Sequence, residues 1–133
     1  NLKVITKVGN NLVETNLKNK RVENAPEHIV RLGFTYTYKD FTLTSQWSHT
    51  SAAYTDANNT VAATANGQNG LIPAYTVGDL TVTYTWNKVY NLKAGINNIS
   101  DTRYFTRRSG GYPGPGVLPS DGRTVFVSIG ASF

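Results

Sequence analysis

The chain has 133 residues, no cysteine and no methionine, and its formal net charge is +5. The absence of cysteine excludes a disulfide framework, a thiolate metal site and a cysteine nucleophile, and no apolar run approaches the roughly 18 residues that a membrane-spanning helix needs. The basic residues are scattered rather than gathered in one run, so a solvated surface explains the charge better than nucleic-acid binding does.

The chain opens with residues 2–8, whose pattern does not decide between a strand and a loop. No signal peptide is visible in this stretch, and the sequence begins at Asn1 without an initiator methionine. We therefore expect the N-terminal part of a longer protein to lie upstream.

The first clear strands cover residues 29–38 and 41–50, where apolar and polar residues alternate with period two. Lys39-Asp40 between them predicts a tight turn, so the two strands form a hairpin. The apolar face carries Val30, Leu32, Phe34, Tyr36, Tyr38, Phe41, Leu43 and Trp47.

Residues 54–74 are rich in Asn, Ala, Thr and Gly without sustained alternation, which predicts a long loop. Alternation returns over residues 75–86, with Leu80, Val82, Tyr84 and Trp86 on one face. Asn87-Lys88 predicts a second tight turn, and a further strand follows over residues 92–97.

A second long loop is expected over residues 106–122, where glycine and proline shape a segment without regular structure. The last strand covers residues 123–133, with Val125, Val127, Ile129, Ala131 and Phe133 on its apolar face. Tight turns thus alternate with long loops along the chain.

These elements predict an all-β, antiparallel, up-and-down transmembrane β-barrel. Short turns on one side, long loops on the other, aromatic residues at the strand ends and strands of about ten residues are typical of outer-membrane barrels. Five or six strands over residues 1–133 are too few for closure, because a membrane barrel needs at least about eight. Alternation alone leaves two alternatives open: a small soluble β-barrel that binds a ligand, and a fragment whose edges pair with another chain.

Five segments, in order along the chain, resemble motifs of TonB-dependent outer-membrane receptors, and the match covers roughly residues 21–133. Asn97 to Phe105 resembles "NNLFDxxYF", and the strand that ends at Phe133 resembles the family's terminal strand. Residues 25–28 resemble "APRH", with Glu27 in place of Arg. Residues 54–60 resemble "YTDAxNT", and residues 72–77 resemble "IPxYTV".

The resemblance implies that residues 1–133 are the C-terminal part of a 22-stranded barrel whose N-terminal plug lies outside this chain. It implies a receptor in the bacterial outer membrane that binds and imports a ferric chelate, ferric citrate or a siderophore, with energy from the TonB complex, which contacts the missing N-terminal region. Expected partners are outer-membrane lipid, lipopolysaccharide and the barrel assembly machinery, which would recognise Val127, Ile129 and Phe133. Both long loops and residues 24–28 would be extracellular, and both tight turns periplasmic.

Residues 112–123 resemble the last extracellular loop of ferric-dicitrate receptors, and Arg107, Arg108 and Tyr112 are the candidate ligand contacts near it. Guanidinium groups bind carboxylates bidentately, and a ferric citrate complex is anionic. A competing interpretation is that the arginines bind lipopolysaccharide phosphates or solvate the loop. Arg123 is expected to anchor the loop through Asp121.

Structural roles are expected for the other polar candidates. Asp101 and Arg103 would satisfy backbone groups at the entry to the last loop, and His49 would bond a neighbour rather than a metal. Asp56, Asn58 and Asn59 favour an Asx-turn over a calcium site. The sequence holds no nucleotide motif, no catalytic triad and no acid–base pair, so we expect no enzymatic activity, no metal site and no directly bound cofactor.

Overall fold

The computed structural model describes residues 3–112 and 114–132, which form β-strands and no helix. Among these residues there is accordingly no apolar helix long enough to cross a bilayer. The predicted all-β class is confirmed.

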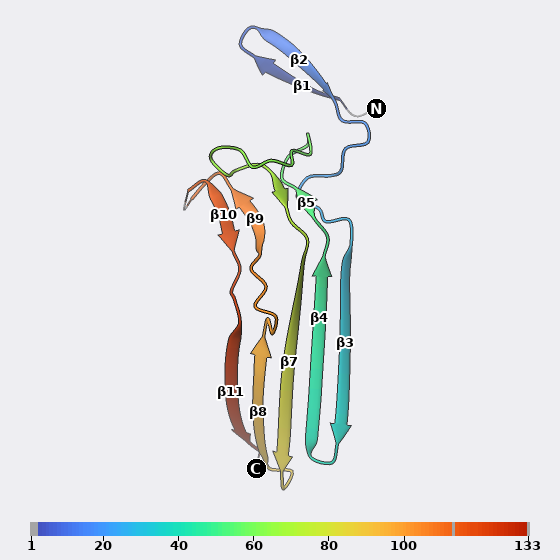
Figure 1. Cartoon of the computed structure of the whole chain (residues 1–133), viewed down its shortest axis with the longest axis vertical. Coiled ribbons are helices and arrows are strands. Elements are labelled where there is room, and N and C mark those ends of the chain that lie inside the picture. Colours follow the sequence, from blue (N-terminus) through green and yellow to red (C-terminus); the bar gives the residue numbers. More distant parts are fainter. Residues whose placement is uncertain (1–2, 113, 133) are drawn as a thin grey trace.

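Five strands form one antiparallel sheet, seen face-on in Figure 1. Their spatial order is β11-β8-β7-β4-β3, so strands that neighbour one another in the sheet also follow one another along the chain. This is the predicted up-and-down order. The strands are β3 (Ile29–Tyr38), β4 (Phe41–Thr50), β7 (Tyr75–Trp86), β8 (Tyr90–Asn97) and β11 (Thr124–Ala131).

The connections are short at one end of the sheet and long at the other (Figure 1). A two-residue turn joins β3 to β4, with Tyr38 opposite Phe41 and Lys39 in the left-handed region at φ 52°. The turn from β7 to β8 has three residues rather than the expected two, because Trp86 lies opposite Tyr90 and the N–H of Val89 donates to the Trp86 carbonyl.

Three smaller strand pairs lie outside the main sheet. They are β1 (Lys3–Val8) with β2 (Asn11–Asn16), β5 (Ala53–Tyr54) with β6 (Leu71–Ile72), and β9 (Phe105–Ser109) with β10 (Gly116–Pro119). The first pair assigns residues 3–8 to a strand, while Leu2 is outside the described residues. The last pair corrects the expectation for residues 106–122, because this loop contains a hairpin.

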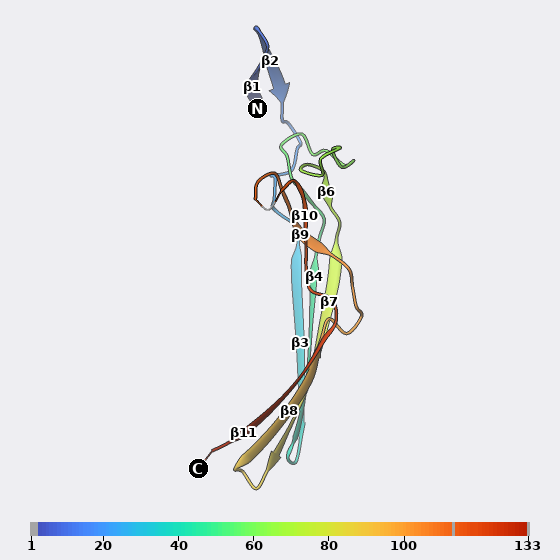
Figure 2. The ribbon, with the colours of Figure 1, turned by 90° about the vertical axis from the view of Figure 1, so that its left-hand side faces the viewer.

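The register places most apolar residues of the five strands on one face of the sheet. Leu32 lies opposite Trp47, Leu43 opposite Val82, and Ala94 opposite Val127. The side chains of this face do not pack into a closed interior: the exposed fraction is 67% for both Leu32 and Val127. Figure 2 shows the sheet edge-on as a single curved layer, with β3 and β11 as its open edges.

Two glycines let aromatic rings lie directly on the sheet, one on each face. A Cβ at Gly78 would come within 2.6 Å of the Trp47 ring, and a Cβ at Gly95 within 2.6 Å of the Phe126 ring. Trp47 belongs to the apolar face, whereas Phe126 alternates with the apolar residues of β11 and lies on the polar face. Large side chains here fill gaps that glycines leave on the neighbouring strands.

Candidate functional site

The exit of β8 is organised around Asn98, the one buried polar residue among those described, with 3% of its surface exposed. Its side-chain oxygen accepts from the N–H of Thr102 at 2.9 Å, and its amide nitrogen donates to the Thr102 carbonyl at 3.0 Å. Its own N–H donates to the Asp79 carboxylate of β7 at 2.9 Å. Asn98 holds a positive φ of 51°, a conformation that asparagine tolerates better than most residues. Asn98 lies in the motif from Asn97 to Phe105, but no periodic pattern in the sequence predicts this role for it.

Asp101 satisfies a backbone group as expected, whereas the Arg103 side chain pairs with Asp101 and not with the backbone. The N–H of Arg123 donates to Asp101 Oδ1 at 2.9 Å, and Arg103 Nη2 lies 3.4 Å from Asp101 Oδ2. The hydrogen bond from Arg123 and then the charge of Arg103 hold the pKa of the Asp101 carboxyl below its usual value. The anchor expected between Arg123 and Asp121 is wrong: no ion pair of the described residues joins them, and Asp101 takes that place.

The loop of residues 54–74 begins with a compact turn around Asp56. The Asp56 carboxylate accepts from the N–H of Thr60 at 2.9 Å and from its hydroxyl at 2.6 Å. Asn59 exchanges two hydrogen bonds with the backbone of Arg21, so this turn also binds the segment that precedes β3. Asp56 therefore closes a turn as expected, but it accepts from the N–H four residues on and not two residues on as in an Asx-turn. The described residues contain no cluster of ligands suited to a metal ion.

Arg108 connects the two long loops. It lies on β9, and its Nη1 and Nη2 donate to the carbonyls of Gly67 and Leu71 at 3.1 and 3.2 Å. The guanidinium carbon is 5.0 Å from the centre of the Phe105 ring, a cation–π distance. Gln68 adds a hydrogen bond of 3.3 Å to the Gly110 carbonyl. The loops of residues 54–74 and 106–122 are thus in direct contact.

Arg107 and Tyr112, the other two candidate ligand residues, are exposed. Arg107 lies opposite Leu118 in the β9–β10 hairpin, and Arg108 lies opposite Val117. Because successive residues of a strand point to opposite faces, the two arginines do not form one cluster. Tyr112 is 99% exposed at the tip of the loop.

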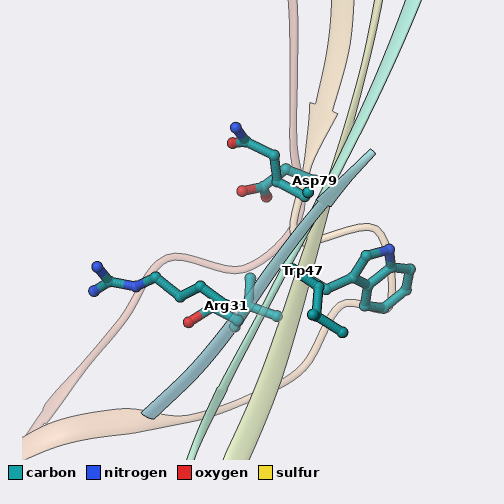
Figure 3. A pocket seen from close by; sticks show the side chains of 8 residues that line it. Arg31, Trp47 and Asp79 are labelled. Atoms are coloured by element: carbon teal, nitrogen blue, oxygen red, sulfur yellow. The ribbon is translucent and has the colours of Figure 1, made fainter. Parts of the chain in front are cut away.

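The polar face of the sheet is lined by hydroxyl, amide and charged side chains. Figure 3 shows Arg31 and Asp79 on one side of the ribbon and Trp47 on the other. Gln46 lies between Gly33 and Asp79 in the register, and the surface is hollowed beside Gly33, where there is no side chain. Paired hydroxyls of Thr37 and Thr42, 3.2 Å apart, continue this face toward the turns.

Aromatic residues gather on the apolar face near the turn end. The rings of Phe41 and Tyr84 are 4.5 Å apart, and those of Trp86 and Tyr90 are 5.5 Å apart. At the opposite end of this face His49 Nδ1 lies 2.8 Å from the Thr76 hydroxyl, so His49 bonds a neighbour as expected. An aromatic band beside the turns is the pattern of a lipid–water boundary.

The candidate assembly signal lies on the last strand. Val127 and Ile129 belong to the apolar face of β11 and are 67% and 80% exposed. Phe133, its third residue, is outside the described residues. The two described residues therefore share one face of an edge strand.

Comparisons with known proteins agree on the family. Residues 5–99 match the family model "TonB dependent receptor-like, beta-barrel". The ferric citrate transporter FecA in its unliganded form is 30% identical, with a TM-score of 0.70 over 79% of this chain and 16% of FecA. Two other structures are similar in fold. The siderophore receptor PiuA from Acinetobacter baumannii is 22% identical (TM-score 0.74, 96% of this chain, 17% of PiuA), and the ferric-catecholate receptor Fiu from E. coli K12 is 19% identical (TM-score 0.65, 80% of this chain, 15% of Fiu).

The chain spans about one sixth of the length of these structures. The matched segment covers most of β1 and all of β2 to β8, and β11 continues the main sheet beside β8. The family consists of transporters and not of enzymes, in agreement with the expectation of no enzymatic activity. From the matched segment and the shared architecture, the chain belongs to the TonB-dependent receptor β-barrel family.

Proposed function

We propose that this chain forms a sector of the barrel wall of a bacterial outer-membrane receptor, and that the complete receptor binds and imports a ferric chelate with energy from TonB. The candidate ligands are ferric citrate and siderophores. Sequence identity of 30% to the ferric citrate transporter FecA favours ferric citrate as the first ligand to test.

The observation that carries the membrane part of this proposal is the separation of the two faces of the sheet. Apolar side chains cover one face and stay exposed, while threonine, glutamine and charged residues cover the other. In a membrane barrel the first face meets lipid and the second lines a wet interior. A soluble β-barrel would instead bury its apolar face, and among the described residues only Ala53 and Ile72 are buried hydrophobic residues.

The ligand would meet the loop end, which we place outside the cell. Arg107, Arg108 and Tyr112 are the candidate contacts, since guanidinium groups and a phenol suit the carboxylates of an anionic chelate. At the opposite end the aromatic band would lie at the periplasmic boundary of the membrane. TonB would act through a region that this chain does not contain, and lipopolysaccharide would surround the loop end.

The barrel assembly machinery is the proposed partner of the last strand. Val127 and Ile129 present an apolar face along an open edge, and Phe133 extends their alternation in the sequence. An edge strand with unpaired backbone groups pairs readily with another strand.

Binding of radioactive ferric citrate to the complete receptor in lipid nanodiscs tests the function. We expect saturable binding that exceeds binding of free citrate, and a weaker affinity after joint replacement of Arg107 and Arg108 by alanine. Ferric catecholate in the same assay separates the two classes of chelate. A receptor that binds neither complex contradicts the proposal.

A further inference from the structure

The two neighbouring arginines of β9 have different surroundings, although the sequence presents them as a pair. Arg108 is half-buried and donates to two carbonyls of the other long loop, whereas Arg107 is exposed. We propose that Arg108 is a positioning residue that holds the loops of residues 54–74 and 106–122 as one unit, and that Arg107 is the arginine of the pair that attracts the anionic ligand. The ligand part of this inference rests on the proposed function; the loop contact does not.

A β-bulge at Thr106 sets this arrangement. Phe105 pairs with Pro119 and Arg107 with Leu118, so that Thr106 has no partner on β10. An extra residue of this kind changes which side chains share a face. Phe105 and Arg108 consequently lie on the same side, where the ring is 5.0 Å from the guanidinium carbon, and Arg107 points the other way.

The bond pattern of Arg108 requires an arginine. Its Nη1 and Nη2 reach two separate carbonyls, those of Gly67 and Leu71, and the planar guanidinium presents these donors in a fixed fork. Lysine has a single nitrogen and lacks this geometry. No ion pair among the described residues includes Arg108, so carbonyl dipoles and the Phe105 ring are what stabilise its charge.

The two loops approach one another closely at the contact that Arg108 completes. A Cβ at Gly67 would lie 3.2 Å from Gly116 Cα, and one at Gly110 would lie 2.6 Å from the Gln68 amide nitrogen. Arg108 supplies the charged hydrogen bonds of this contact, and such bonds are stronger than neutral ones. Loss of Arg108 is therefore expected to loosen the contact between the loops, whereas loss of Arg107 removes a charge and leaves the contact intact.

The experiment compares Arg108→Ala with its neighbour Arg107→Ala in the complete receptor in nanodiscs. Hydrogen exchange measured by mass spectrometry reports the loop contact without any ligand. We expect amides of residues 64–71 to exchange at least about tenfold faster in Arg108→Ala, a factor that corresponds to about 1.4 kcal/mol, and at the wild-type rate in Arg107→Ala. Arg108→Lys keeps the charge, so faster exchange in this variant as well assigns the effect to the lost fork.

Binding of ferric citrate at several salt concentrations supplies the second measurement, because screening weakens direct attraction between charges. Arg107→Ala is expected to weaken binding and to lower its salt dependence. Arg108→Ala is expected to weaken binding about tenfold with the salt dependence of the wild type. The same lowered salt dependence in Arg108→Ala, an unchanged affinity, or unchanged exchange of residues 64–71 would each overturn the inference. A wild-type receptor that binds no chelate overturns the proposed function instead. In that case the hydrogen-exchange rates still test the loop contact, because they are measured without ligand.

Discussion

In the five-stranded sheet the large apolar side chains of one face are exposed, whereas at the loop end Ala53, Ile72 and Asn98 are buried. The sheet is held by regular backbone pairing and by ladders of hydroxyl groups, such as that between Thr37 and Thr42. The loop end is held by individual side-chain bonds that join distant segments, such as Arg108 to Gly67. In the proposed barrel, lipid would cover the apolar face of the sheet, whereas the loop end supplies its own burial.

The strongest test of this comparison places a charge on each face of β11. We expect Val127→Asp to destabilise the inserted receptor by about 3 kcal/mol, because its carboxylate would face hydrocarbon. Ser128→Asp is the matched control, since Ser128 lies on the polar face opposite Lys93. The folded fraction in lipid vesicles measures both variants, and equal yields would show that the faces are assigned wrongly.

Asn98 tests the loop end in the same way. Asn98→Ala removes both bonds to Thr102 and leaves buried backbone groups unpaired, which should lower the free energy of unfolding by about 2 kcal/mol. Asn97→Ala is the control, because Asn97 is exposed and its side chain donates only to the Thr124 hydroxyl. Urea unfolding in vesicles measures the free energy of unfolding of both variants. If Asn97→Ala lowers it by as much as Asn98→Ala, burial at residue 98 is not what stabilises this turn.

Packing within the sheet gives a smaller effect. Gly95→Ala would bring a methyl group within 2.6 Å of the Phe126 ring and 3.0 Å of the Leu80 carbonyl, and overpacking of this kind should cost about 1 kcal/mol. Gly33→Ala meets nothing within 4 Å and should leave stability unchanged. The urea midpoints of the two variants measure this difference in stability. A Gly95→Ala midpoint equal to that of the wild type would show that the contact with the Phe126 ring does not limit the side chain at residue 95.

Acid should weaken the loop end through Asp101. The pKa of this carboxyl lies below its usual value because it accepts the Arg123 N–H and lies near Arg103. A carboxyl with a lowered folded pKa stabilises the protein fully above its ordinary value and loses that contribution as the pH falls through the folded pKa. Asp101→Asn should therefore flatten the acid side of a stability profile measured between about pH 5 and pH 2. A profile of unchanged shape would exclude Asp101 as the cause.

The sequence predicts the sheet well because its signal is local. Period-two alternation and a two-residue turn define β3 and β4 with the bounds that the structure gives, Ile29–Tyr38 and Phe41–Thr50. The β9–β10 hairpin has no such signal, because glycine and proline interrupt its alternation. The hairpin also contacts the loop of residues 54–74, which is distant in the sequence. Which faces Arg107 and Arg108 occupy depends on the bulge at Thr106, which no periodic pattern reveals.

The contacts of the loop end are harder to predict for the same reason. Arg108 and Gly67 are 41 residues apart, and a single sequence carries no periodicity that links them. Asp101 was assigned correctly to backbone support because acidic side chains at strand exits commonly accept N–H bonds. The partner of Arg123 was predicted wrongly as Asp121, because the choice between Asp101 and Asp121 depends on how the chain folds back.

The alternating directions of the main strands constrain how this sheet is completed. Five antiparallel strands leave β3 and β11, the two open borders, running the same way. Identical copies joined border to border in a ring would meet in parallel, which conflicts with the uniformly antiparallel pairing of bacterial barrels. A closed antiparallel barrel has an even number of strands, so an odd number of strands must be added to these five. Self-assembly of the sheet into a ring is therefore excluded. The β1–β2 hairpin, with two strands, is also insufficient alone.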